Sequence, residues 1–327
     1  MHTRPFGNTG RSVGEIGLGT WQIGGDWGAV SDASALDTLR AAYTAGVTFF
    51  DTADVYGGGR SETLIGQFLR EVPAARDAVF VATKLGRNNW PNGFTRDQVR
   101  RFTEASLKRL GVEALDLTQL HCIPTEVLKR GEMFGWLEEL KQEGKIKAYG
   151  ASVESMDEAL FCVGHDGCTS LQIIFNIFRQ KPVSTLFTAA REKQVALIVR
   201  LPLASGLLAG KLTKQTAFAK DDHRRSNRDG QQFNVGETFA GLPYEKGVEL
   251  AEALKSRVPA GVSMAAWALR WCLDFEAVTV VIPGARNPSQ VASNLAAAAL
   301  PPLHEAVHAE LAEFYRNEVA DHIRGPY

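Results

Sequence analysis

Four polar side chains of complementary chemistry lie at or just after the ends of apolar runs in this 327-residue sequence. Asp51, Lys84 and His121 each close such a run, and Tyr56 follows Asp51 by five positions. A phenol titrates at about 10, and we expect an adjacent lysine ammonium to lower the pKa of Tyr56. The carboxylate would keep the lysine charged, and the imidazole could hydrogen-bond a carbonyl oxygen. Together these groups could protonate an oxygen while hydride reaches the carbon that bears it.

Each of these residues, taken alone, has a more ordinary interpretation. Asp51 could be a helix N-cap or a turn residue, and Tyr56 could be a packed aromatic with a satisfied hydroxyl. His121 could be a hydrogen-bonded core histidine. Lys84 is less ordinary, because a lysine that closes a buried apolar pattern must find a partner. The joint placement of the four residues favours catalysis.

Eight short β-rich runs recur along the chain, separated by segments with helical patterns. Most of the runs are almost continuously apolar, as expected for parallel strands that are buried on both faces. Between them, residues 61–69 carry an apolar face at helical spacing, capping-box spacing starts at Thr95 and Ser155, and residues 303–314 carry a C-terminal apolar stripe. The β-rich runs are residues 13–20, 47–51, 78–84, 115–121, 145–152, 170–176, 194–201 and 277–283.

Eight strand–helix repeats without a break in composition predict an α/β fold, a single-domain (β/α)8 TIM barrel over residues 1–327. We expect an extra helix at its C-terminus and a long loop after its seventh strand. The alternative, an open doubly wound sheet, usually carries Gly-x-Gly-x-x-Gly after its first strand. Here Gly17 and Gly19 begin that pattern, but Gln22 replaces the third glycine. In a barrel, the active site lies at the carboxyl ends of the strands, where the four polar side chains fall.

Composition excludes several other classes of protein. The formal net charge is −1, so an extended nucleic-acid-binding surface is not expected. No apolar run approaches the length of a membrane span, and the first residues lack the apolar segment of a signal peptide, so we expect a cytoplasmic protein. The four cysteines are too scattered for a disulfide framework or a zinc pattern. We expect buried free thiols and no metal site.

One long polar segment, residues 214–244, interrupts the strand–helix alternation. Loops of this length in a compact barrel are usually functional or disordered. Residues 221–230 include Arg224, Arg225 and Arg228, which could close over a bound anion. A solvated insertion is an equally good interpretation, so two hypotheses remain for this segment.

The order and spacing of several motifs resemble those of the aldo-keto reductases. The resemblance extends from about residue 5 to about residue 298, and two of its blocks, Asp-x-Ala-x-x-Tyr-Gly and Ile-Pro-Gly-Ala-Arg, are specific. The matching residues are Gly19-Thr20-Trp21, Asp51 to Gly57 with Ser61-Glu62, Thr83-Lys84, Leu120-His121, Gly150-Ala151-Ser152, Pro202 to Lys211 and Ile282 to Arg286.

This resemblance implies reduction of an aldehyde or ketone by NADPH, with NADH as a second candidate, and a small-molecule carbonyl substrate. It implies a catalytic tetrad of Asp51, Tyr56, Lys84 and His121, with Tyr56 as general acid. Arg286 suits a 2′-phosphate and favours NADPH. The residues implied to bind the cofactor are Gly19, Thr20, Trp21 and Asp51 at the nicotinamide ribose, Ser152 and Gln172 at the carboxamide, Arg200 beside the ring, Pro202, Leu203, Ser205, Gly206, Leu208 and Lys211 around the pyrophosphate, and Gly284, Arg286, Gln290 and Asn294 at the adenosine. The implied substrate walls are Trp21, Tyr56, His121 and Trp90.

Three positions depart from the common family pattern. Arg200 stands where an aromatic ring often stacks on the nicotinamide. Its charge would disfavour the oxidised ring, unless the guanidinium turns toward another anion. Val153 replaces a frequent asparagine, which would remove one carboxamide hydrogen bond, and Gln290 replaces a second phosphate-binding arginine found in some members.

Two other functions remain open at this point. The chain could be a cofactor-binding regulatory subunit that resembles the channel β-subunits of the same superfamily, with little turnover. It could also be a barrel enzyme with unrelated chemistry, which would bind no nicotinamide nucleotide.

Overall fold

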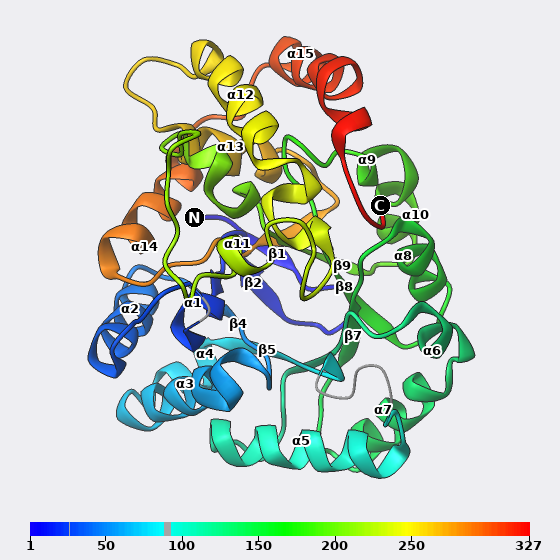
Figure 1. Cartoon of the computed structure of the whole chain (residues 1–327). Helices are drawn as coiled ribbons and strands as arrows, with labels where there is room; N and C mark the ends of the chain where they lie inside the picture. Colours follow the sequence, from blue (N-terminus) through cyan, green and yellow to red (C-terminus); the bar gives the residue numbers. More distant parts are fainter. Residues whose placement is uncertain (26, 88–92) are drawn as a thin grey trace.

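The computed structural model describes residues 1–25, 27–87 and 93–327 and contains one eight-stranded parallel barrel. Each strand pairs in parallel with the next, and bridges between Ile16 and Val281 and between Gly19 and Gly284 close the circle (Figure 1). The predicted (β/α)8 barrel is therefore confirmed. Its strands are β3 (Leu18–Gly19), β4 (Phe49–Asp51), β5 (Phe80–Leu85), β6 (Leu117–His121), β7 (Tyr149–Ser152), β8 (Cys168–Ile174), β9 (Ala196–Arg200) and β10 (Val278–Val281).

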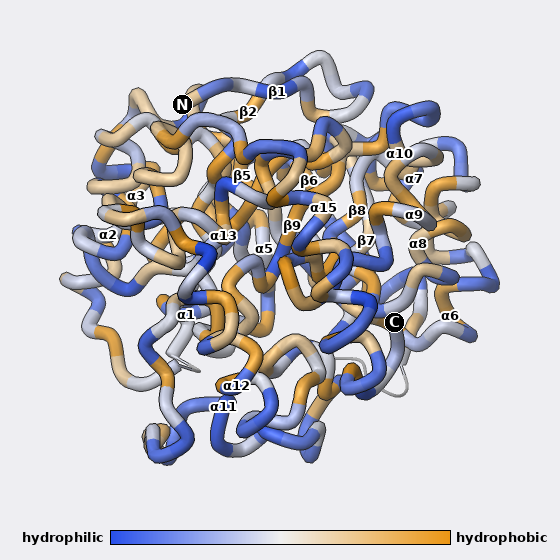
Figure 2. The backbone as a smooth tube through the Cα atoms, turned by 90° about the horizontal axis from the view of Figure 1, so that it is seen from above, coloured by the Kyte–Doolittle hydropathy of each residue, from blue (hydrophilic) through white to orange (hydrophobic). Residues whose placement is uncertain are grey.

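A short N-terminal hairpin closes one end of the barrel. Strands β1 (Thr3–Pro5) and β2 (Ser12–Gly14) are antiparallel, and the connection between them places Phe6 against the barrel floor. The ring of Phe6 lies 5.5 Å from that of Phe49 and 4.7 Å from that of Phe80. Figure 2 shows this hairpin and α11 at opposite ends of the barrel. Because the apolar hairpin covers this end of the barrel, we expect the active site at the other end, where the carboxyl ends of the strands lie.

Helices surround the barrel (Figure 1), and the predicted caps form at two of them. Thr95 Oγ1 accepts from the backbone N–H of Gln98, and Ser155 and Glu158 complete a reciprocal capping box. The helices are α1 (Trp21–Gly24), α2 (Asp32–Thr44), α3 (Arg60–Glu71), α4 (Ala75–Ala78), α5 (Arg96–Leu110), α6 (Thr125–Arg130), α7 (Glu132–Gln142), α8 (Met156–Val163), α9 (Pro182–Thr185), α10 (Phe187–Glu192), α11 (His223–Ser226), α12 (Tyr244–Leu254), α13 (Met264–Leu273), α14 (Pro288–Leu295) and α15 (Glu305–Phe314).

The C-terminal stripe forms α15, which packs on the core through the buried side chains of Leu311 and Phe314. All four cysteines are buried free thiols, as expected. Within the part of the chain that the structure describes, no helix has the length and apolar character to traverse a bilayer.

Candidate active site

A cavity of about 350 Å³ opens at the carboxyl ends of the barrel strands. Its lining comes from segments scattered between β3 and α14, which meet only because the barrel closes. Among its other lining residues, which were not predicted as site residues, are Arg87 and Glu237. The predicted site residues that line it are Gly19, Trp21, Asp51, Tyr56, His121, Gln172, Arg200, Pro202, Leu203, Ser205, Gly206, Lys211, Gly284, Arg286, Gln290 and Asn294.

Four other predicted site residues lie within the walls and do not line the cavity. They are Thr20, Lys84, Ser152 and Leu208, and all four are buried. Trp90, predicted as a substrate wall, lies outside the described residues.

Lys84 connects two other members of the predicted tetrad, Asp51 and Tyr56, from within the wall of the cavity. Its Nζ donates to Asp51 Oδ1 at 2.6 Å, to the carbonyl oxygen of Thr52 at 2.8 Å and to the Tyr56 hydroxyl at 3.3 Å. Lys84 and Asp51 come from the ends of neighbouring strands, β5 and β4, which are paired in parallel. The charged lysine therefore has three hydrogen-bond partners, which offset the cost of burying its charge.

Backbone geometry sets the position of the Tyr56 ring. Tyr56 starts a single 3₁₀ turn, Tyr56–Gly59, whose three glycines all have positive φ. A side chain at Gly57 would also collide with α1, because a Cβ there would lie 2.2 Å from the carbonyl oxygen of Gly24. The run of glycines thus permits a sharp turn directly after Tyr56.

The pKa of Tyr56 differs in direction from the prediction. Burial raises the pKa of the phenol above its usual value, and the nearby charge of Asp51 raises it further. Lys84 lowers it as expected, but the opposing effects are larger. The prediction of a lowered pKa was wrong for this reason. Tyr56 therefore holds its proton at neutral pH, as a proton donor must.

Gln172 contacts the tetrad directly. Its amide nitrogen donates to Asp51 Oδ2 at 2.7 Å, so this side chain helps to orient the carboxylate. The family resemblance implies Gln172 only as a carboxamide ligand.

His121 is a neutral hydrogen-bond acceptor on its cavity side. Its ring lies edge-on to Tyr56, with the ring centroids 5.9 Å apart, and its Nε2 lies 3.4 Å from a terminal nitrogen of Arg87. A guanidinium can only donate, so Nε2 accepts. Burial, and then the charges of Arg87, Lys84 and Arg200, hold the pKa of His121 well below its usual range.

Glu237 balances two arginines beside this histidine. Arg87 donates to Glu237 through both terminal nitrogens, and Arg200 lies 3.4 Å from the same carboxylate. Burial alone would raise the pKa of Glu237, but the two guanidinium groups outweigh burial and hold the pKa at about 2. Arg200 also donates to the carbonyl oxygen of Val153 at 3.3 Å. Arg200 thus turns toward an anion, Glu237, which is one of the two outcomes expected for this residue.

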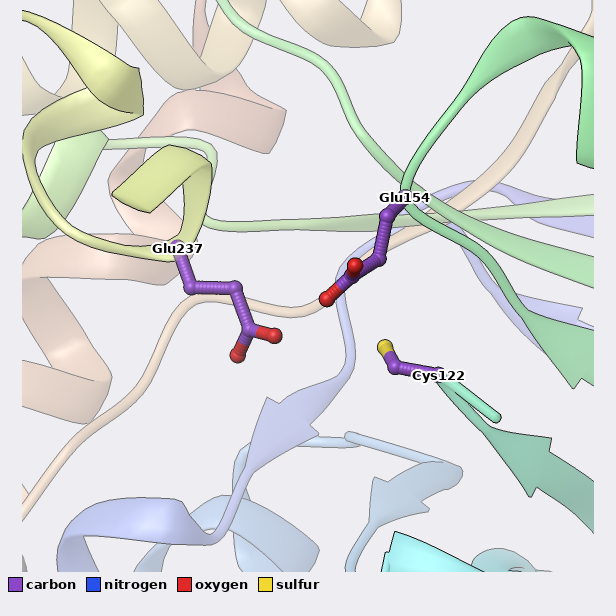
Figure 3. A group of neighbouring side chains, drawn as sticks. All are labelled: Cys122, Glu154 and Glu237. Carbon is purple, nitrogen blue, oxygen red and sulfur yellow. The ribbon is translucent and has the colours of Figure 1, made fainter. Parts of the chain in front are cut away.

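The side chains of Cys122, Glu154 and Glu237 point toward one another and form a compact cluster (Figure 3). One potential ligand atom from each lies within 4.8 Å of the others. A metal ion would have to compete with Arg87 and Arg200 for Glu237, and the two guanidinium charges disfavour a further cation. Burial and the neighbouring Glu237 raise the pKa of Glu154 to about 7.

Polar groups gather at the opposite end of the cavity. The side chain of Arg286 donates to the carbonyl oxygen of Trp27 at 3.2 Å, and its backbone N–H donates to Gln290 at 3.0 Å. Asn294 donates to the carbonyl oxygen of Gly284 at 3.1 Å. Arg286 is exposed at this end of the cavity.

The segment 214–244 lies over the cavity without pointing all of its arginines inward. Arg224 lines the cavity, stacks over Trp27 and pairs with Asp222. Arg228 instead stacks over Tyr244, 4.2 Å from the ring centroid. Closure of this segment over an anion stays a prediction.

A buried carboxyl group beside the tetrad should make stability depend on pH. Neither oxygen of Asp54 has a hydrogen-bond partner among the described residues, and burial, together with nearby Glu62, raises the pKa of Asp54 to about 7. The folded protein keeps this proton up to about pH 7, whereas the unfolded chain releases it at about pH 4. The contribution of Asp54 to the free energy of unfolding is therefore full below about pH 4 and falls as the pH rises toward 7, by at most about 1.4 kcal/mol per pH unit.

We expect Asp54→Asn to remove this dependence. Relative to the parent protein, the variant should gain stability steadily between pH 5 and pH 7 in urea unfolding experiments. A constant cost of the buried amide cancels in this comparison. A stability difference that does not change with pH would show that Asp54 is already ionised in the folded protein.

Comparisons with known proteins agree with this geometry. A sequence model of the Aldo/keto reductase family matches residues 15–316. Aldo-keto reductase YhdN of Bacillus subtilis (strain 168) is 31% identical over 297 residues, which cover 89% of this chain and 87% of that protein. The chain belongs to the aldo/keto reductase family, and it is an NAD(P)H-dependent oxidoreductase.

Two further relatives and a solved structure span nearly the whole chain. An NADH-specific methylglyoxal reductase of Escherichia coli (strain K12) is 29% identical over 317 residues, with 91% of this chain and 93% of the relative covered. A probable voltage-gated potassium channel subunit beta of Arabidopsis thaliana is 29% identical over 325 residues, with 93% of each covered. The structure of the glycerol dehydrogenase AKR11B4 from Gluconobacter oxydans superposes with a TM-score of 0.75 at 28% identity, over 99% of this chain and 97% of that one.

Proposed function

We propose that this protein reduces an aldehyde or ketone to an alcohol with NADPH, and that Tyr56 is the general acid. The observation that carries the proposal is the position of Lys84 Nζ, within hydrogen-bonding distance of both Asp51 and the Tyr56 hydroxyl on the cavity floor. This arrangement suits a proton donor whose conjugate base needs a nearby positive charge.

In this proposal Tyr56 acts on the carbonyl oxygen, and the other residues at the cavity floor support it. The bound nicotinamide nucleotide supplies the hydride. Tyr56 gives its proton to the carbonyl oxygen, and the phenolate that remains is stabilised by the ammonium of Lys84. Asp51 keeps that ammonium charged and, held by Gln172, fixes its direction. Neutral His121 shapes the space in which the carbonyl oxygen lies.

The donor groups of the cavity fit an extended dinucleotide. Cationic and amide side chains at one end, including Arg286 and Asn294, suit a phosphorylated adenosine, and the loop from Pro202 to Lys211 offers small residues and backbone N–H groups for a pyrophosphate. Gly206 has positive φ in this loop, so the backbone can turn without a side chain. Ser152 remains a proposed carboxamide ligand, although its hydroxyl lies beside Cys122 in the wall.

Arg286 should decide which nucleotide is preferred. An Arg286→Gln substitution removes the positive charge expected at the 2′-phosphate. We expect the Kd for NADPH to rise about 10- to 100-fold, because charge-assisted hydrogen bonds are lost, while the Kd for NADH changes little. Titration by quenching of tryptophan fluorescence measures both constants. An equal effect on the two nucleotides would place the 2′-phosphate elsewhere.

The alternative function is a cofactor-binding regulatory subunit. The similarity to a probable channel subunit beta supports this alternative. The deciding experiment is a nucleotide titration followed by a panel of aldehydes and ketones with the tighter-binding nucleotide. Turnover of members of the panel supports the reductase. Tight nucleotide binding without turnover of any carbonyl compound favours the regulatory subunit, and absence of nucleotide binding contradicts both.

A further inference from the structure

Arg200 is a charged side chain close to the expected position of the nicotinamide ring. It ends β9 and lines the cavity together with Tyr56 and Gln172. Its guanidinium donates to Cys122 Sγ at 3.5 Å, and this sulfur lies 3.6 Å from the hydroxyl of Ser152, the proposed carboxamide ligand. A nucleotide held by Ser152 would therefore have the charge of Arg200 near its ring.

The oxidised and reduced nucleotides respond differently to a charge at this position. The nicotinamide ring of NADP+ is a cation, whereas the ring of NADPH is neutral. A net positive charge beside the ring therefore weakens the binding of NADP+ and has little effect on the binding of NADPH. The net charge depends on the carboxyl groups that face Arg200.

Two guanidinium groups and two carboxyl groups form what we call the charged cluster, namely Arg87, Arg200, Glu154 and Glu237. Glu237 pairs with both arginines and stays ionised at neutral pH, since its pKa is about 2. Two positive charges and this one negative charge leave one net positive charge, so the state of Glu154 decides the total. The half-buried side chain of Glu154 points toward Glu237 (Figure 3) and donates to it when protonated.

Glu154 is the member of the charged cluster that changes its charge near neutral pH. Burial and the neighbouring Glu237 raise the pKa of Glu154 to about 7, whereas burial raises the pKa of the Cys122 thiol to about 11. Burial lowers the pKa of nearby Arg179 only to about 10, so this group stays charged. The charged side chains that face Glu154 are Arg87, Arg179, Arg200 and Glu237. The charged cluster therefore gains one negative charge as the pH rises through about 7.

We propose that Glu154 sets the preference of the site between the oxidised and the reduced nucleotide, and that it acts through Arg200. With Glu154 ionised, the charged cluster is neutral and NADP+ binds more tightly. With Glu154 protonated, the cluster is positive and discriminates against NADP+. The proposal rests on the nucleotide binding proposed above. Glu154 does not line the cavity, so it influences the nucleotide only through its neighbours.

The test measures the Kd of NADP+ and the Kd of NADPH by isothermal titration calorimetry at about pH 6 and about pH 8.5. The ratio of the two constants cancels the titration of the 2′-phosphate, which both nucleotides carry. In the parent protein, we expect Kd(NADP+)/Kd(NADPH) to fall about 5- to 30-fold between the lower and the higher pH. Glu154→Gln should keep the high ratio at both pH values.

Two further variants test whether the effect comes from the charge of Glu154. Asp54→Asn is the matched control, because it removes another buried carboxyl group whose pKa is about 7, and it should retain the fall of the ratio. Glu154→Asp keeps a carboxyl group that titrates and should also retain the fall. Should Glu154→Gln fail to fold, Glu154→Ala carries the same expectation of a high ratio at both pH values.

The pH dependence separates charge from a structural defect. The parent protein and Glu154→Gln should agree at the lower pH, where both are neutral at position 154, whereas a structural defect would persist at both pH values. A ratio in the parent protein that does not change with pH, or an equal fall in the parent and in Glu154→Gln, would overturn the proposal. Loss of the fall in Asp54→Asn alone would assign the effect to Asp54 and overturn it too. Absence of binding of either nucleotide would instead contradict the proposed function.

Discussion

Tyr56→Phe should lower kcat about 100- to 10,000-fold, because it removes the proposed proton donor and leaves the rest of the site in place. The ring of Tyr56 is stacked on Trp21, with centroids 5.9 Å apart and planes 15° apart, and phenylalanine retains that packing. Lys84 keeps its partners Asp51 and the carbonyl oxygen of Thr52. Stability and nucleotide affinity should therefore change little.

The measurement is steady-state reduction of the best substrate of the panel, with nucleotide Kd and thermal unfolding as controls. A loss of turnover with unchanged Kd and unchanged unfolding temperature assigns the effect to proton transfer. Turnover near that of the parent protein would mean that another group protonates the carbonyl oxygen.

Lys84→Met should reduce stability as well as activity. The substitution leaves the carboxylate of Asp51 buried without its cation, and breaking a buried pair in this way typically costs about 3–5 kcal/mol. Urea unfolding at neutral pH measures the loss of stability. Activity should also fall, because no charge remains to stabilise the Tyr56 phenolate.

A second substitution separates these two effects. Asp51→Asn combined with Lys84→Met removes both charges, and we expect it to recover much of the lost stability without recovering turnover. Recovery of turnover in the double variant would show that the ammonium of Lys84 has a structural role only. A single Lys84→Met variant as stable as the parent protein would contradict the energetic importance of the pair.

The barrel and the tetrad could be predicted because both depend on local sequence. Apolar runs of strand length identify parallel strands, and barrel geometry then brings Asp51, Lys84 and His121 to one end. Lys84 could be predicted as a site residue from the sequence alone, because a charged side chain at the end of a buried strand requires a partner. The extent of residues 1–327 as one domain stays a prediction, although the observed strands and helices span most of that range.

The ion pairs of Glu237 with Arg87 and Arg200 could not be predicted from the sequence in the same way. Arg87 and Glu237 are 150 positions apart, and their pairing depends on the path of the segment 214–244 over the cavity. Arg87 alone could have been predicted as a site residue, because it follows the end of β5 at Leu85 by two positions. The raised pKa of Tyr56 likewise needed the structure, since residue identity shows a neighbouring charge but does not show the depth of burial.

The segment that carries Glu237 is attached to two parts of the cavity at once. Ser205, in the loop proposed to hold the pyrophosphate, donates to the carbonyl oxygen of Glu237 at 3.4 Å and accepts from the backbone N–H of Phe239 at 3.1 Å. The side chain of Glu237 meanwhile holds Arg87 and Arg200 at the substrate wall. A displacement of this segment that broke these contacts would therefore also release Arg87 and Arg200 from Glu237. If nucleotide release needs this displacement, we expect a variant selected for faster release to differ also in the substrates that it accepts.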